Sequence, residues 1–213
     1  MHLRRSVLRL LFRAGRGLGL VDGDPTLDVV LPRRSSLRAR PLDPVEVALC
    51  RSAALPSLTG TRLAAAWGLA EATARTSELP HLSVGDVDLD GRRVWIHGGG
   101  RTIPRWGQLS VWGAVQIERH LRGHPSTRHD QRLVYRGAGS AESRQASACI
   151  AIKEVLTRAG LGGEPDVRPL SVTAWAGRQI LEESGRIEEV AQRLGMRSLD
   201  RAAALIGFDW ADR

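Results

Sequence analysis

The sequence contains few of the residues on which several classes of protein depend. Only two cysteines, Cys50 and Cys149, occur in 213 residues, and they lie far apart. This excludes a disulfide framework and a zinc site built on cysteine. No apolar run approaches the roughly 20 residues that a membrane-spanning helix needs. The basic first residues lack the apolar stretch and cleavage site of a secretory signal. We therefore expect a cytoplasmic protein that uses no metal ion and no cofactor.

Lysine is almost absent as well, because Lys153 is the only lysine among 31 basic residues. Arginine therefore carries nearly all of the positive charge, with a net charge of +8 and a pI near 11.1. A planar guanidinium suits phosphate oxygens, so a domain rich in arginine favours nucleic acid as a partner. A GC-rich genome produces the same composition without any such function. Charge alone thus leaves DNA binding a hypothesis.

Hydrophobic periodicity predicts a mainly helical α+β protein with one small antiparallel sheet. Leucines and valine at three- and four-residue spacing predict a first helix that ends at Gly17 and Gly19, and a basic stretch over 31–40 indicates a linker. We divide the chain into 1–40 and 41–213. In the second part the pattern predicts strands at 94–96 and 103–109, and helices over about 44–54, 61–74, 110–122, 141–159, 171–184, 186–194 and 199–206.

Several segments resemble, in order along the chain, the motifs of tyrosine recombinases of the phage-integrase type. The resemblance covers nearly the whole sequence and implies a fold like the catalytic domain of that family, preceded by one helix left from a core-binding domain. Four segments carry the resemblance. The end of the core-binding domain resembles Gly17-Leu18-Gly19-Leu20-Val21-Asp22 with Asp24-Pro25-Thr26-Leu27, and the start of the catalytic domain resembles Pro41-Leu42-Asp43-Pro44-Val45-Glu46-Val47. The first signature resembles Arg75-Thr76-Ser77-Glu78-Leu79 leading to Asp86-Val87-Asp88, and the closing turn resembles Gly195-Met196-Arg197-Ser198-Leu199-Asp200.

The resemblance also implies a chemistry. In this family a tyrosine hydroxyl attacks a DNA phosphodiester and forms a 3′-phosphotyrosine link. Two arginines and a histidine hold the non-bridging oxygens, where negative charge gathers in the transition state. A lysine on a hairpin gives a proton to the departing oxygen, and a further histidine or tryptophan lies beside the phosphate. Each of these six positions has a counterpart in this chain.

Two of the six positions keep a positive charge. Arg75 stands at the first arginine, and the resemblance implies that its guanidinium and the amides of a short helix beginning at Ser77 and Glu78 face one phosphate. The alternative is a surface Arg75 that pairs with Glu78 three residues later. Gly100 or Arg101 stands at the hairpin lysine. Arg101 could contact phosphate, but arginine hardly ever gives up a proton and is a poor general acid.

The other four positions lack the chemistry that the family uses. Pro169 and Val172 stand where the histidine and arginine of the second motif belong. Met196 replaces the histidine or tryptophan of the third motif, and Leu205 stands at the nucleophilic tyrosine. The only tyrosine, Tyr135, lies in a short apolar run that predicts a core or strand position. The sequence therefore predicts a pseudo-enzyme in which no catalytic set is intact.

Three hypotheses of function remain. The first is a non-catalytic protein that binds double-stranded DNA through Arg75, Arg101 and Arg105, accessory to DNA recombination or integration and located on the bacterial nucleoid when bound. In it the segment 199–213 supports self-association or binds a partner recombinase. The second is a protein-interaction or remnant domain without affinity for DNA. The third is an active integrase whose alignment is shifted, and a Tyr135 exposed beside Arg75 in a basic cleft would support it.

Overall fold

A computed structural model of the chain contains two compact units, residues 1–37 and 38–213, each of which is described by itself. The structure describes residues 2–27, 39–55, 57, 60–125, 129–135 and 139–208. The first unit holds α1 (His2–Gly17), as its periodicity predicts. After α1 the chain turns through Gly19 at φ 68°, and Arg16 reaches back to Asp24 at 3.8 Å. Val7, Leu10 and Leu11 on α1 remain exposed.

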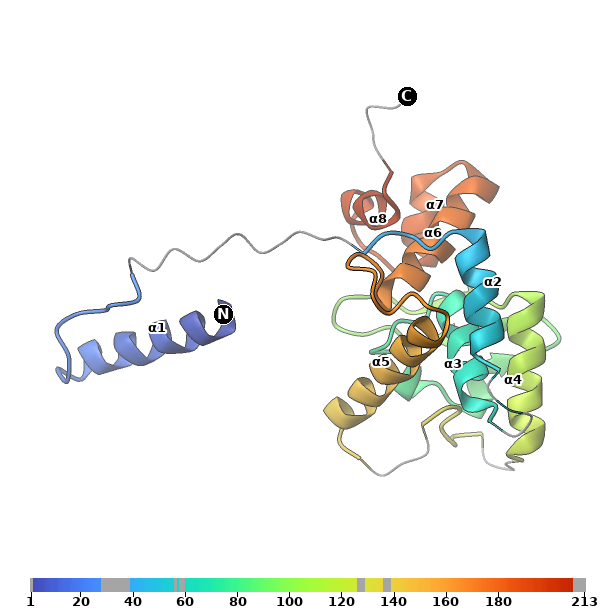
Figure 1. Ribbon diagram of the computed structural model, residues 1–213, viewed down its shortest axis with the longest axis horizontal. Coiled ribbons are helices and arrows are strands. Elements are labelled where there is room, and N and C mark those ends of the chain that lie inside the picture. The colour runs from blue at the N-terminus through green and yellow to red at the C-terminus, as the bar shows by residue number, and fades with distance from the viewer. Residues whose placement is uncertain are drawn as a thin grey trace. The chain divides into compact units, whose positions relative to one another are not determined.

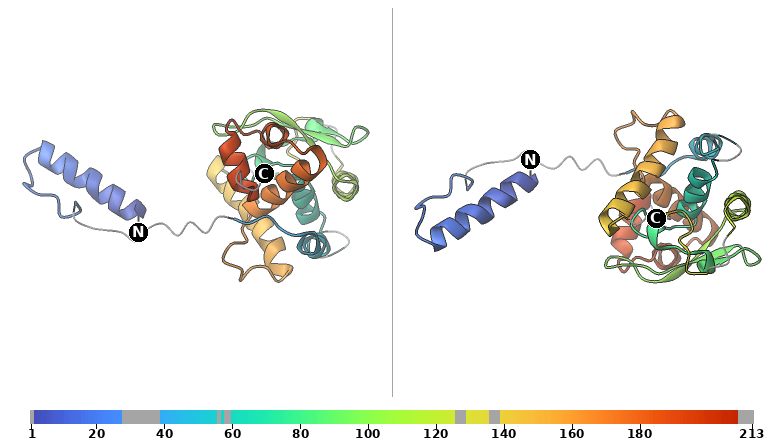
Figure 2. Two further views of the ribbon diagram at one scale, coloured as in Figure 1. Left: turned by 90° about the horizontal axis from the view of Figure 1, so that it is seen from above. Right: turned by 90° about the horizontal axis from the view of Figure 1, so that it is seen from below.

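The second unit is a helical body with a small sheet on its outside (Figures 1 and 2). None of the described helices is long and apolar enough to cross a membrane. The described helices of this unit are α2 (Pro44–Ala53), α3 (Arg62–Glu71), α4 (Val111–Gly123), α5 (Ala141–Arg158), α6 (Leu170–Ser184), α7 (Ile187–Arg193) and α8 (Leu199–Ile206), with short 3-10 turns η1 (Leu79–His81) and η2 (Val84–Asp86).

Local chemistry explains where α2 and α3 begin and end. Asp43 caps α2 by accepting from the N–H of Glu46, whose own carboxylate accepts from the N–H of Asp43. The sequence predicted α3 to continue to about residue 74, but it ends at Glu71. Thr73 explains the difference, because it lies at φ 77°, in the left-handed region that a right-handed helix cannot contain.

The sheet is antiparallel in the order β1-β2-β3. Its strands are β1 (Val87–Asp88), β2 (Arg93–Ile96) and β3 (Arg105–Gln108), with Val94 opposite Gly107 and Trp95 opposite Trp106. The strand β1 was not among the predicted strands, since two residues are too few to show a period of two. The sequence also predicted a longer third strand. Pro104 cannot donate to a ladder, and β3 begins directly after it.

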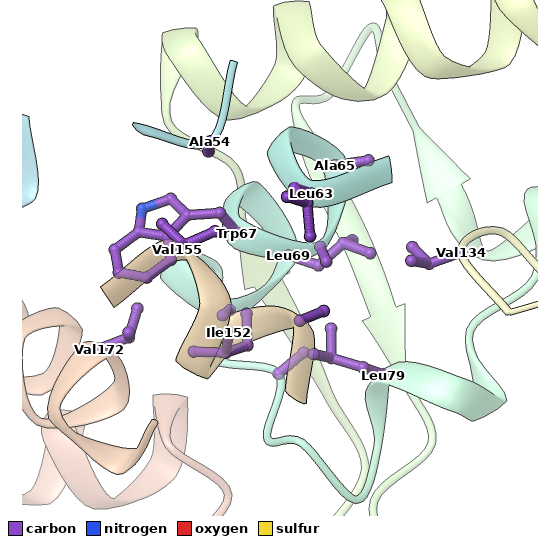
Figure 3. Close-up of a cluster of buried hydrophobic side chains, with 14 of the residues drawn as sticks. Ala54, Leu63, Ala65, Trp67, Leu69, Leu79, Val134, Ile152, Val155 and Val172 are labelled. Carbon is purple, nitrogen blue, oxygen red and sulfur yellow. The ribbon is translucent and has the colours of Figure 1, made fainter. Parts of the chain in front are cut away.

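The core of the second unit surrounds α3, whose residues from Leu63 to Glu71 are all buried. Figure 3 shows Trp67 and Leu69 of α3 beside Ile152 and Val155 of α5, with Val172 of α6 nearby. A second hydrophobic cluster joins the last three helices and contains Ile180, Val190, Leu194 and Ile206. The body is thus one large core around α3 with a smaller core in α6–α8.

Candidate functional site

The candidate site is a small cavity around Arg75, a short distance after the end of α3. The cavity measures about 120 Å³, and its walls come from α3, the following loop, α5 and the start of α6. The Nε atom of Arg75 is buried without a hydrogen-bond partner, and its guanidinium forms no ion pair with any residue that the structure describes. Burial lowers the pKa of Arg75, Glu78 raises it and Arg105 lowers it, yet a guanidinium stays charged at neutral pH. A cation in this setting suits an anionic ligand.

Glu78 lies beside this cavity but pairs with Arg105. The Nη2 atom of Arg105 lies 2.9 Å from Oε2 of Glu78, and the two side chains are 4% and 3% exposed. Thr102 donates its hydroxyl to Glu78 at 2.6 Å, and the N–H of Arg75 donates at 2.8 Å. Burial raises the pKa of Glu78, but the bonds and charge of Arg105, with Thr102 and the Arg75 N–H, lower it overall. The alternative of a surface ion pair between Arg75 and Glu78 is therefore not found, and no sequence pattern indicates Arg105 as the partner of Glu78.

Arg105 was expected to contact DNA phosphate, and its position is a correction to that expectation. The residue is only 6% exposed. Its guanidinium donates to Glu78, to the carbonyl of Thr73 at 2.6 Å and to the carbonyl of Ile103 at 3.3 Å. Because these bonds keep it in the interior, Arg105 supports the loop that carries Arg75 rather than facing a ligand. The short helix predicted at residues 77–78 is also later than expected, since η1 begins at Leu79.

Arg101 lies on the turn between β2 and β3 and is exposed. The turn is closed by backbone hydrogen bonds between Gly99 and Thr102. Since the hydroxyl of Thr102 binds Glu78, the turn is tied to the loop that contains Arg75. The structure therefore brings the neighbourhoods of the two predicted phosphate contacts, Arg75 and Arg101, together.

The start of α6 forms the wall of the cavity opposite the Arg75 loop. Pro169, Leu170 and Thr173 line it, whereas Val172 is fully buried in the main core. Leu170 and Thr173 are three residues apart and so share one face of the helix. Val172, which the sequence analysis placed at the second arginine, therefore lies in the core, and its neighbour Thr173 lines the cavity. Neither residue supplies a cation.

Met196 and Leu205 pack against the second hydrophobic cluster and are partly buried. The turn before Met196 lies close to the buried pair of Glu78 and Arg105. The carbonyl of Gly195 accepts from the N–H of Ile103, two residues before Arg105, at 3.0 Å. A Cβ at Gly195 would lie 2.6 Å from Nη1 of Arg105. The closing turn therefore reaches the site, but its Met196 side chain brings no hydrogen-bonding group that could hold a phosphate.

Tyr135 lies elsewhere in the second unit. It is 6% exposed and belongs to the main core, which confirms the prediction of a core position. Its ring lies under the guanidinium of Arg62, 5.4 Å from centroid to Cζ, and it lines a different cavity from Arg75. Tyr135 is therefore neither exposed nor in the same cavity as Arg75, the arrangement that would have supported the hypothesis of an active integrase.

Comparisons with known proteins identify the fold. No protein-family model and no curated protein sequence matches the chain. Among solved structures it is similar to XerA recombinase, with a TM-score of 0.65 and 18% identity over 96% of this chain and 70% of that one. It is also similar to a "lambda integrase(75-356) dimer bound to a COC' core site", with a TM-score of 0.64 and 16% identity over 98% and 74%. The integrase from mycobacterium phage Brujita gives a TM-score of 0.54 and 19% identity over 96% and 70%.

At these identities the similarity shows the fold alone. The chain is mainly helical with a three-stranded antiparallel sheet, and this architecture is that of the recombinase and integrases above. The predicted fold class is therefore confirmed.

Proposed function

We propose that this chain, which has the fold of recombinases and integrases, is a protein that binds double-stranded DNA without cutting it. One observation carries the proposal. Arg75 lines a cavity with its Nε atom buried and without a hydrogen-bond partner, and its guanidinium forms no ion pair with a carboxylate of the described residues. A phosphate oxygen of DNA supplies the missing anion, in the charge-assisted geometry that arginine favours.

Charges around the cavity support DNA as the ligand. Three exposed cations each adjoin, in sequence, a residue that lines the cavity or contacts the Glu78–Arg105 pair, and none of the three forms an ion pair with a described residue: Arg101, Lys153 and Arg168. Cations left without carboxylate partners are available to phosphates along a duplex. Arg105, which is buried, is not part of this proposed interface.

The walls of the site support the absence of strand cleavage. Pro169, where the family resemblance implies a histidine, lines the cavity, and Val172, where it implies a second arginine, is buried in the main core. Leu205, at the position of the nucleophile, packs against Ile180 and its neighbours in the second cluster. With no hydroxyl to attack and only one guanidinium to hold the phosphate, binding can persist while the covalent route is lost.

The proposed partner is DNA held without a covalent link, in a role accessory to recombination or integration. The lambda integrase dimer named above is bound to a core site, and we extend that mode of binding to this chain. The segment 199–213 is proposed to contact a second copy or a partner recombinase. Leu199 on α8 is exposed, and residues 209–213 lie outside the described part of the chain.

Fluorescence anisotropy with a labelled duplex over a salt series tests the proposal. We expect binding that weakens steeply with salt, and weaker binding by about tenfold in Arg75→Gln, because a charge-assisted hydrogen bond to phosphate is lost. Arg101→Gln should lower the slope of log K against log salt by about 0.9 for one phosphate contact. Arg178→Gln is the matched control, since Arg178 is exposed on α6 and near only Glu182.

Two results would contradict the proposal. Absence of binding at low salt by a folded, monodisperse sample would favour an interaction or remnant domain instead. A covalent adduct with a nicked duplex, lost in Tyr135→Phe, would show an active recombinase with a different nucleophile. Equal affinities of wild type, Arg75→Gln and Arg178→Gln would keep DNA binding but reject the Arg75 cavity as the phosphate site.

A further inference from the structure

A second and larger cavity lies away from Arg75, where the N-termini of α3 and α5 meet the end of α4. It measures about 400 Å³, which is within the range of small-molecule sites. Its polar lining comes from Arg62 at the start of α3, Tyr135, and the first two turns of α5 with Gly139 before them. The α5 residues are Ser143, Arg144 and Ser147. His120, His124 and Val134 complete the wall.

The charges of this cavity are unbalanced. Arg62 and Arg144 line it, no aspartate or glutamate does, and neither arginine forms an ion pair with a residue of the described chain. Glu142, in the first turn of α5, is exposed and is not part of the lining, although hydrogen bonds and then the charge of Arg144 lower its pKa. Burial lowers the pKa of His81, and the charges of Arg132 and Arg144 lower it further. The cavity therefore favours a negatively charged occupant.

Hydrogen-bond donors in its wall lack acceptors. The hydroxyl of Tyr135, in a residue that is 6% exposed, makes no hydrogen bond of standard geometry; burial raises its pKa, while Arg62 and the nearby hydroxyl of Ser147 lower it. Arg144 donates one Nη to the carbonyl of Gly139 at 2.6 Å, but its Nε is buried and unpartnered. The N-terminus of the 18-residue helix α5 adds a partial positive charge at the same place. Buried donors without acceptors are costly, so an acceptor-rich ligand stabilises this arrangement.

We propose that the cavity between Arg62, Tyr135 and the N-terminus of α5 is a binding site for a phosphate group. The oxygens of a phosphate group accept hydrogen bonds, and the guanidiniums and hydroxyls of this wall can donate them. The phosphate can belong to a free small anion or to a DNA backbone, and the chemistry of recognition is the same for both. This site is independent of the Arg75 cavity and does not rest on the proposed function.

Titration calorimetry of the full chain with inorganic phosphate, at ionic strength held constant with chloride, tests the site. We expect saturable binding, weakened about tenfold or more by Arg144→Gln and by Arg62→Gln, since each removes one charge-assisted contact. Tyr135→Phe should weaken binding a few-fold while keeping the ring in the core. Arg158→Gln is the matched control, because Arg158 lies on the same helix, is paired with Glu154 at 2.7 Å and is 14 residues further along α5.

The outcomes divide clearly. Selective loss in the Arg62, Arg144 and Tyr135 variants supports the site, with circular dichroism confirming that each variant is folded. No binding by the wild type, or equal weakening in Arg158→Gln, would overturn the proposal, because the second result describes general charge screening.

Duplex DNA, measured by anisotropy, then identifies the source of the phosphate. If Arg144→Gln lowers DNA affinity while Arg158→Gln does not, and inorganic phosphate competes better than matched chloride, the site holds backbone phosphate. If DNA affinity is unchanged in a variant that has lost phosphate binding, the site holds a free anion. Both results support a phosphate site, and Arg75→Gln tests the other cavity separately.

Discussion

Glu78 connects three stretches of chain through one carboxylate. Arg105 of β3, the hydroxyl of Thr102 in the hairpin turn and the N–H of Arg75 all donate to it. The opposite charges of Glu78 and Arg105 compensate each other in the interior. Removing either residue would therefore leave the charge of the other buried without an opposite charge. At the scale of single residues, this pair fixes the loop that holds the candidate phosphate contact.

Glu78→Gln should lower the free energy of unfolding by about 3 kcal/mol, because it leaves the Arg105 charge uncompensated in a buried place. Urea unfolding followed by circular dichroism measures the change. Glu182→Gln is the control, since Glu182 is exposed and 4.0 Å from Arg178, and it should change stability by less than about 1 kcal/mol. Similar losses in the two variants would mean that the buried pair contributes no more than a surface pair.

The same pair predicts a dependence on pH. The folded state lowers the pKa of Glu78 below the ordinary value of about 4.3. Its contribution to stability is therefore fully present above that value and is lost as pH falls through the folded pKa. The difference in stability between wild type and Glu78→Gln should shrink below about pH 4.3. A constant difference down to pH 3 would contradict this account.

The two cysteines should differ sharply in reactivity. Cys50 is fully buried in the main core, and burial, with the charges of Glu46 and Glu71, raises its pKa to about 12. Cys149 is exposed on α5. Because the thiolate is the nucleophile, iodoacetamide at pH 8 should add once to the native chain and twice in denaturant, as intact mass spectrometry can show. Two additions to the native chain would place Cys50 at the surface.

At the scale of elements, α3 is the centre on which the other parts pack. Its contacts with α4, α5 and α6 leave no exposed face after Leu63, and α3 and α4 approach closely where Gly68 faces Gly113. The strand β3 crosses the end of α3 at Gly107, where a Cβ would lie 2.2 Å from the carbonyl oxygen of Ala72. The sheet can therefore rest on the helix only because residue 107 has no side chain.

Gly107→Ala should lower the free energy of unfolding by about 3 kcal/mol, since backbone must shift to admit the methyl group. Thermal and urea unfolding measure the effect. Gly99→Ala is the matched control in the same hairpin, because its Cβ would meet only Thr102 Oγ1 at 3.9 Å, and it should change stability by less than about 0.5 kcal/mol. A tolerated Gly107→Ala would show that β3 can move away from α3.

At the scale of the whole molecule, periodicity was sufficient to predict the helices and the fold class. The sequence could not predict features that depend on distant parts of the chain. Glu78 pairs with Arg105, which lies 27 residues further along the chain, and no sequence pattern indicates this pairing. The sequence also could not show that Val172 of α6 lies in the main core while Thr173 lines the Arg75 cavity. The left-handed Thr73 also has no signature in its residue type.

The division of the second unit into two hydrophobic clusters has a consequence for synthesis on the ribosome. Helix α6 contributes Val172 to the first cluster and Ile180 to the second, so neither can close before α6 has emerged. Helix α2 meets α5, which is made almost a hundred residues later. Its apolar face therefore stays without its partner through most of translation, which leaves hydrophobic surface exposed on the growing chain.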